Sequence, residues 1–553
     1  MISRCYLGVA GAALGLLLGA GGCGNPSDRS MTTPTPDAIA DRPEAGHDNA
    51  VHDDLEGADA AASAVQVDVD AHRPAMWLSD YKLFRDLRSR VPNAGVIPYQ
   101  LRDAQFVDGA RSQHFLYLPP STHAVYRGRD VFDFPVGTVL VQTLSFAHDL
   151  ADPAAGAQTV ETRLLIHQTK RWVAVPYLWN ADGSDARRAV VGGKTDVTWR
   201  QEDGSLHKLQ YRTPDMNQCK RCHKNEGVVR PIGTKAGNLN CEIEWAGGHG
   251  NQLAHWVALE RLEGVPIATD TIPRFPVWHD PTTGTVTQRG RTWLDVNCAH
   301  CHNPRGQASV SGLDLSIVQN EPARFGVYKA PVAAGRGSHG YRFGIKPGAP
   351  ERSFLLARIR STDPGVMMPP VGRSVVDEGG AALIEEWIAA MPVDPQLEQR
   401  ALNPVAAYHG ALSGGDAARG RDIFYHKIKC ITCHTADGPN GGTVGPNLAG
   451  IASRRPPEYL LESMVAPSAK IVEKYGTVTV QLDTGRMVTG VLSHEDVYEL
   501  VLKQIDGKEV SIRKEAIEER SSTPTSIMPA MANLLTVDEV GDLLAFLETL
   551  KEP

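Results

Sequence analysis

The sequence predicts a multidomain α+β protein, in which an N-terminal antiparallel β domain precedes mainly α-helical domains and the last domain carries a small β insertion. First, 553 residues of which 42% are hydrophobic and 22% charged are enough for several globular cores. Second, short apolar runs separated by Gly, Pro and Asp extend from His114 to Tyr211, which is typical of antiparallel strands. Third, a C-x-x-C-H pattern occurs three times and divides the rest of the chain. The predicted divisions are 1–22, 23–75, 76–213, 214–286, 287–403 and 414–553.

The charge balance excludes one class of partner. Lys and Arg number 56 against 64 Asp and Glu, which gives a formal net charge of -8. A protein that binds a phosphate backbone needs a surplus of basic residues. We therefore expect no nucleic-acid partner.

Residues 1–22 have the pattern of a signal peptide, with Arg4 before an apolar run and small residues at the end. The run is shorter than the roughly 20 residues that a spanning helix needs. The Ala-Gly-Gly-Cys sequence ending at Cys23 resembles the lipobox of bacterial lipoproteins, which implies lipidation of Cys23 and attachment to the periplasmic side of a membrane. Gly24, where Asp would retain a lipoprotein in the inner membrane, favours the outer membrane. The alternative is ordinary cleavage that leaves Cys23 free.

The segment 23–75 is expected to be a disordered acidic tether. It has no aromatic residue, and from Gly24 onward it carries eleven Asp or Glu against three Arg. An extended chain of this kind would hold the folded body away from the membrane surface.

The C-x-x-C-H pattern is the attachment signature of c-type haem. The two thiols add to the porphyrin vinyl groups, and the adjacent His is the proximal iron ligand. Composition alone predicts about 0.005 matches in this chain. Zinc and disulfides are the alternatives, but neither requires a His directly after the second Cys. The sequence thus predicts three covalent haems, with thioethers at Cys219, Cys222, Cys298, Cys301, Cys430 and Cys433 and proximal ligands at His223, His302 and His434.

In the last division, Gly420 and Phe424 share a helix face before the third motif, and a Thr536–Glu539 capping box opens a final helix. With the loop Gly445-Pro-Asn-Leu, these features resemble the class I cytochrome c fold. The resemblance implies that the Pro446 carbonyl accepts the His434 N–H and that Met528, which precedes a Pro, is the sixth ligand. Met464, Met487 and Met531 are expected in the core. Alternation around Thr477–Arg486 and Ile505–Lys508 predicts the β insertion.

In the middle division, a helix leads into the second motif, residues 311–315 occupy the place of the proximal loop, and Met368-Pro precedes an apolar helix with Trp387. Met368 is the expected sixth ligand, with Met367 less favoured, and His300 is expected to be exposed. About residues 77–392 resemble a family of bacterial diheme c-type cytochromes secreted as lipoproteins, and the third haem is an addition to that family's pattern. The resemblance rests on Phe134-Pro-Val-Gly-Thr-Val-Leu, Glu161-Thr-Arg-Leu-Leu-Ile, Asn217-Gln-Cys-Lys-Arg-Cys-His, Asn297-Cys-Ala-His-Cys-His-Asn-Pro and Pro331-Val-Ala-Ala-Gly-Arg-Gly.

The first motif follows a strand-like segment, Lys208-Leu-Gln-Tyr-Arg, and no Met lies between it and the second motif. Its sixth ligand stays open: His249, His255 and Met216 are candidates, and a vacant position is another. Cys241, outside the motifs, is expected to be a buried apolar residue.

Three functions are compatible with these features. The leading hypothesis is a membrane-tethered periplasmic triheme cytochrome that transfers electrons between a redox enzyme and a further carrier. The alternative is a haem enzyme with an open haem 1, peroxidase-like or acting on a small nitrogen compound, which haems 2 and 3 connect to its redox partners. A third is a binding protein whose β domain docks a partner.

Overall fold

The computed structural model describes residues 64–552, apart from 333–334, 439, 484–486, 506 and 522–525. The expected signal peptide, Cys23 and most of the acidic tether therefore lie outside the described residues. In the part of the chain that the structure describes, no helix combines the length and the apolar character that membrane crossing needs.

The folded region begins earlier than the expected boundary at residue 76. The Val65 and Val67 side chains pack on the core of the β domain, and the Gln66 N–H donates to the Tyr81 carbonyl at 2.9 Å. Alternating valines thus anchor a segment whose average composition predicts disorder.

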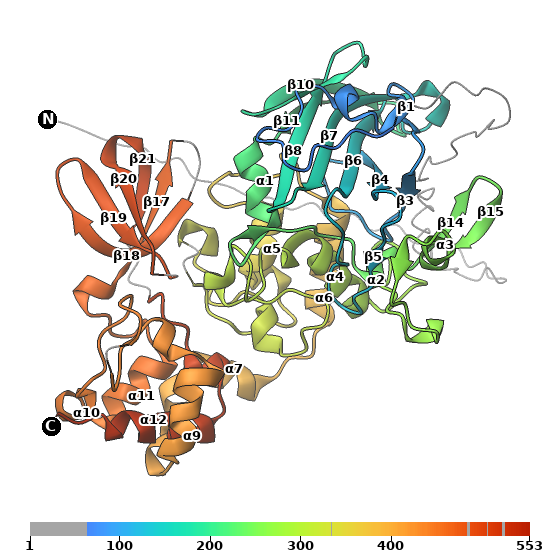
Figure 1. The fold of residues 1–553 in the computed structure, drawn as a ribbon. Helices are drawn as coiled ribbons and strands as arrows, with labels where there is room; N and C mark the ends of the chain where they lie inside the picture. The colour runs from blue at the N-terminus through green and yellow to red at the C-terminus, as the bar shows by residue number, and fades with distance from the viewer. Residues whose placement is uncertain are drawn as a thin grey trace, which may run out of the picture. The chain divides into compact units, whose positions relative to one another are not determined.

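An antiparallel sheet with strand order β3-β4-β6-β7-β8-β9 forms the N-terminal domain, as the sequence predicts (Figure 1). Its side chains alternate between two buried faces. In neighbouring register pairs, Phe115 and Val141 face one core, whereas Leu116 and Leu140 face the other. The strands are β3 (Val96–Tyr99), β4 (Arg111–Tyr117), β6 (Val139–Ala147), β7 (Ala157–His167), β8 (Trp172–Trp179) and β9 (Ala186–Arg188).

Short elements complete this region and connect it to the first motif. The strand predicted before the motif is present as β11, but the motif itself lies on a helix, α1, because the Asp215 carboxylate caps the Asn217 and Gln218 N–H groups. The additional strands are β1 (Phe84–Asp86), β2 (Val91–Pro92), β5 (Ala124–Val125), β10 (Gly193–Arg200), β11 (Leu206–Thr213), β12 (Lys224–Asn225), β13 (Val228–Val229), β14 (Glu242–Trp245), β15 (Gly248–Asn251) and β16 (Leu262–Glu263), and the helices are α1 (Met216–His223), α2 (Ala236–Leu239) and α3 (Gln252–Ala258).

The middle region is helical, and its core gathers around Trp293 and Trp387. Helix α4 continues into one π-helical turn, Asp295–Ala299, which delivers the second motif. Gly290 of α4 faces the Trp387 ring, since a Cβ there would lie 3.3 Å from it. The helices are α4 (Val286–Leu294), α5 (Phe354–Arg360), α6 (Glu378–Ala390), α7 (Pro395–Leu402) and α8 (Pro404–Ala407).

The last region has the same opening pattern. Helix α9 also continues into a π-helical turn, Ile423–Lys427, before the third motif, and α12 packs across α9. The expected capping box of Thr536 and Glu539 opens α12. The helices are α9 (Ala417–Asp422), α10 (Ile451–Arg454), α11 (Pro457–Val465) and α12 (Val537–Thr549).

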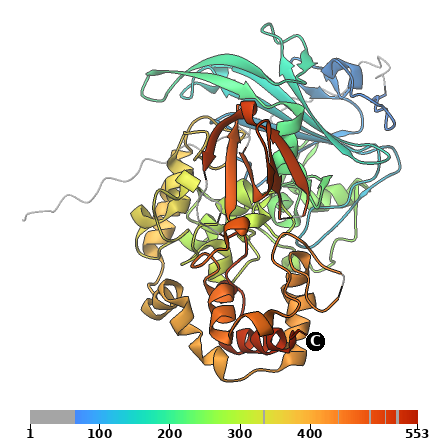
Figure 2. The same ribbon diagram turned by 90° about the vertical axis from the view of Figure 1, so that its left-hand side faces the viewer.

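The predicted β insertion lies between α11 and α12. It is an antiparallel sheet with strand order β20-β19-β18-β17-β21 and a small core of its own. In Figure 2 its strands lie side by side in the orange to red part of the ribbon. The strands are β17 (Thr477–Leu482), β18 (Met487–Glu495), β19 (Glu499–Lys503), β20 (Glu509–Arg513) and β21 (Ile517–Ser521).

Candidate functional site

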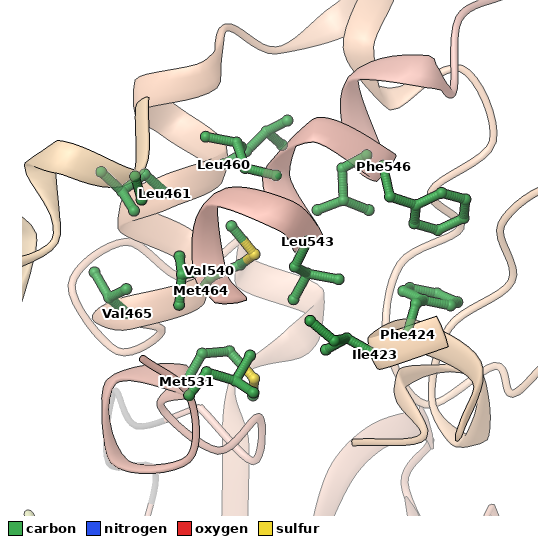
Figure 3. Packing of buried hydrophobic residues seen from close by; sticks show 14 of the residues in the cluster. Ile423, Phe424, Leu460, Leu461, Met464, Val465, Met531, Val540, Leu543 and Phe546 are labelled. Atoms are coloured by element: carbon green, nitrogen blue, oxygen red, sulfur yellow. The ribbon is translucent and has the colours of Figure 1, made fainter. Parts of the chain in front are cut away.

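The third motif follows α9 and its π-helical turn, and α9 crosses α12. A Cβ on Gly420 would lie 1.9 Å from the Asp542 carbonyl oxygen, so only glycine permits this close approach. One turn later, the rings of Phe424 and Phe546 meet with centroids 5.4 Å apart. Figure 3 shows these rings at one side of a core that also contains Met464. Gly420 and Phe424, which the sequence places on one helix face, thus both lie at this crossing.

His434 is held in one orientation. Its Nδ1–H donates to the Pro446 carbonyl at 2.8 Å. This is the hydrogen bond that the resemblance to the class I cytochrome c fold implied. Gly445 makes room for the ring, because a Cβ there would lie 2.5 Å from the imidazole Cε1. The ring is buried, and burial lowers its pKa, so it is a neutral ligand near pH 7.

The second motif has an equivalent arrangement with a different acceptor. The Ser311 hydroxyl donates to the Ala308 carbonyl at 2.7 Å, so its oxygen accepts the Nδ1–H of His302 at 3.0 Å. Ser311 belongs to the segment that the sequence places at the proximal loop. Burial, assisted by the positive charge of Arg358, lowers the pKa of His302 to about 4.

The first motif is closed by a very small hairpin, β12–β13. Glu226 and Gly227 at its turn both have positive φ, 48° and 85°, as a two-residue hairpin turn requires. The hairpin returns Arg230 to His223, where the backbone N–H of Arg230 donates to the His223 carbonyl at 2.8 Å and the imidazole Nδ1–H donates to the Arg230 carbonyl at 2.9 Å. No sequence signal pointed to Arg230, because any residue supplies a carbonyl.

All three imidazoles therefore engage Nδ1 with a protein oxygen, so Nε2 is the remaining coordinating atom of each ring. This orientation, with two half-buried thiols within one turn of chain, is what a covalently attached haem needs from its proximal side. The residues present fit the group at all three motifs. When bound, haem supplies an iron that cycles between the ferrous and ferric states.

A buried lysine near the second motif, Lys329, indicates an anionic ligand. The side chain of Lys329 is 7% exposed, and its Nζ has no hydrogen bond or ion pair among the described residues. Burial alone lowers its pKa to about 8. Gly312 follows the Ser311 that holds His302, and a Cβ added at Gly312 would lie 3.5 Å from this Nζ. A buried ammonium without a carboxylate partner fits the propionates of a haem held at His302.

The loop of Met368 is fixed beside the same motif. The Met368 N–H donates to the Arg358 carbonyl at 3.0 Å, and the guanidinium of Arg373 donates to the Met368 carbonyl at 2.8 Å. Arg373 acts electrostatically on Cys298, as Arg358 does on His302. Met368 is half-buried and Met367 is buried. The sequence did not indicate these two arginines, because the residue type alone does not distinguish a buried arginine from an exposed one.

Met528 is half-buried and packs against the core of the last region. Its N–H donates to the Ser526 hydroxyl at 3.2 Å. Met464 and Met531 are fully inside that core, as expected (Figure 3). Met487 lies on β18, and its side chain is outside the described set.

The three candidates for the sixth ligand of haem 1 have other surroundings. Met216 packs on the core of the β domain. His249 is exposed on the β14–β15 hairpin, and His255 stacks on Trp245 with ring centroids 3.9 Å apart. Figure 1 shows β14, β15 and α3 well apart from α1. The charged group that does face the motif is Arg163, paired with the fully buried Glu161 at 2.8 Å and acting electrostatically on Cys219.

His300 and Cys241 were also singled out in the sequence. His300 is half-buried rather than exposed, because it lies against Cys222 of the first motif. Cys241 is buried as expected, and its thiol donates to the Leu239 carbonyl at 3.6 Å. Burial raises its pKa to about 11.

The geometry of the last region is that of a haem-binding helical domain with a fixed proximal histidine. A family model for cytochrome c matches residues 417–502, a stretch that contains the third motif and ends before Met528 and α12. The C-terminal region thus contains a cytochrome c domain, which implies covalently bound haem c and a protein of electron transfer. No curated protein matches the chain in sequence.

Proposed function

We propose that the chain is a triheme c-type cytochrome, lipid-anchored through Cys23 on the periplasmic side of a bacterial membrane, that transfers electrons between a redox enzyme and a further carrier. The observation that carries the haem count is the shared orientation of His223, His302 and His434, each fixed through Nδ1 by a different element. The three oxygens that accept the Nδ1–H groups come from unrelated segments, yet each leaves Nε2 free to coordinate a metal. This shared orientation favours three sites of the same kind.

The middle region supports the proposal by its likeness to the cytochrome c domain that follows it. Both open with a helix and a π-helical turn before the motif, and both pack a glycine of that helix near an aromatic of their last long helix. Both carry a half-buried Met next to a Pro ahead of that last helix. A thioether ligand favours ferrous iron and raises the potential, as suits an electron carrier.

The haem count is tested on protein matured in a host that attaches c-type haem. Mass spectrometry of the intact chain should give three haems, and the paired Cys→Ala variants of each motif (C219A/C222A, C298A/C301A and C430A/C433A) should each lose one. Cys241→Ala is the matched control, because Cys241 is buried but outside the motifs, and it should keep three. A wild-type chain with one haem would refute the triheme proposal.

The anchor is tested separately by fractionation. We expect the mature chain in the membrane fraction and Cys23→Ser in the soluble periplasmic fraction. An unchanged distribution in Cys23→Ser would contradict lipid anchoring and leave the haem count unaffected.

A further inference from the structure

The first and second motifs touch each other. The ligand atoms of Cys222, His300 and Cys301 all lie within 4.8 Å of one another. The Cys301 thiol also donates to the carbonyl of Arg221 at 3.2 Å. The contact joins the second cysteine of one motif to the second cysteine of the next.

Backbone hydrogen bonds beside the motifs fix this contact. The Glu226 N–H donates to the Arg305 carbonyl at 2.9 Å, and Asn225 forms a β-bridge with Gly306. Gly306 itself cannot be replaced without a shift, since a Cβ there would lie 2.2 Å from the Cys301 carbonyl oxygen. The turn of the first hairpin is thus attached to the loop that follows the second motif.

Deeper contacts lock the two regions at several further points. Lys235 pairs with the buried Asp295 at 2.7 Å, directly before the second motif. The Asn297 side chain accepts from the Phe106 N–H at 2.9 Å. The Asp108 carboxylate accepts from the Ser374 hydroxyl at 2.7 Å, beyond the Met368 loop. Buried polar contacts of this kind specify one arrangement, because any other leaves them unpaired.

We propose that the first and second motifs form one paired-haem unit, joined at Cys222, His300 and Cys301. The inference rests on the proposed triheme function and adds to it which two centres interact. Each thioether sulfur is bonded directly to a vinyl carbon of its porphyrin. With both haems attached, the contact between Cys222 and Cys301 would therefore bring the vinyl sides of the two porphyrins together. His300 is the positioning residue of the joint.

The expected consequence is electrostatic coupling between the two centres. For two irons about 15 Å apart in a medium of effective dielectric about 20, a unit charge on one would change the reduction equilibrium constant of the other roughly sixfold. The reduction equilibrium of haem 1 should therefore depend on the redox state of haem 2.

The first experiment compares mature holoprotein with two variants, each lacking one haem. Redox titration followed by EPR should show that C298A/C301A changes the reduction equilibrium constant of haem 1 about sixfold, whereas C430A/C433A leaves it unchanged. In the oxidised wild type, the EPR signals of haems 1 and 2 should be altered by magnetic interaction and recover when one of them is reduced.

The second experiment keeps all haems and changes only the joint. His300→Gln should retain three haems by mass and change the splitting between the reduction steps of haems 1 and 2. His494→Gln, an exposed histidine of the β insertion, should leave every step unchanged.

The outcomes separate the two proposals. Three haems that titrate independently, with unperturbed EPR signals, overturn the pairing and leave the triheme function intact. A chain with zinc at Cys222, His300 and Cys301 and no haem at the first two motifs overturns both, since two thiolates and an imidazole are also zinc ligands.

Discussion

Replacing Gly420 by Ala tests whether the α9–α12 crossing holds the third haem site. The added Cβ would lie 1.9 Å from the Asp542 carbonyl oxygen and 2.9 Å from the Phe546 Cβ. Real contacts stay above 3.0 Å, so the helices would have to separate by at least about 1 Å. Because the obstacle is backbone rather than a flexible side chain, the cost should lie near the upper end of overpacking, about 3 kcal/mol.

Hydrogen exchange of the mature protein, followed by mass spectrometry, measures this cost where it arises. Amides of α9 and α12 that exchange by unfolding of the last region should exchange about a hundredfold faster in Gly420→Ala, since every 1.4 kcal/mol is a factor of ten. Peptides of the N-terminal sheet should not change. Gly438→Ala is the matched control in the same region, because nothing lies within 4 Å of its Cβ position. Equal exchange in Gly420→Ala and Gly438→Ala would refute the steric account of the crossing.

Three further predictions concern the proposed haem ligands and the charges of the described residues. Met528→Ala should lower the reduction potential of haem 3 by part of the roughly 0.8 V that axial ligands span, and it should allow cyanide to bind the iron. Met531→Leu, a change in the core, should alter neither property in a spectroscopic redox titration. An unchanged haem 3 potential in Met528→Ala would exclude Met528 as the ligand. Lys329→Met should make reduction of haem 2 less favourable by roughly 1 to 2 kcal/mol, because a buried positive charge is lost. Arg352→Met removes an exposed charge and should leave the haem 2 potential unchanged. Equal haem 2 potentials in the two variants would count against a position of Lys329 near that haem. Hydrogen bonds from Arg520 and Lys514 lower the pKa of Glu495 to about 2. The contribution of Glu495 to the stability of the β insertion is therefore complete above about pH 5 and is lost as the pH falls toward 2. Hydrogen exchange of the β17–β21 amides should show this pH dependence, and Glu495→Gln should abolish it.

The parts of the site that sequence could predict are those in which neighbouring residues carry the chemistry. The motifs, the Gly-Pro loop of Pro446, the capping box of Thr536 and the alternating strands are local patterns, and the structure has each of them. Gly420 could be found because helix periodicity places it one turn from Phe424.

The features that sequence missed depend on pairing between distant segments. His300 was expected to be exposed, but it is half-buried because Cys222 lies against it from another region. Lys329 reads as a surface residue for the same reason, since burial is a property of the fold. The helix that carries the first motif follows a strand directly, so the apolar periodicity that announces a helix is missing and only the Asp215 cap signals it.

The joint between the first two motifs constrains the biogenesis of the protein. Residues 216–223 are synthesised before residues 298–302, and the final fold places the Cys222 thiol against Cys301. Each thiol must be accessible when a haem vinyl group is added to it. In the proposed triheme protein, both additions therefore precede docking of the two regions. A chain that docks too early would hold two reduced thiols against one another, and in the proposed periplasmic location they would close into a non-native disulfide. In the proposed protein, the order of the two haem additions and of docking would therefore affect how many chains reach the mature state.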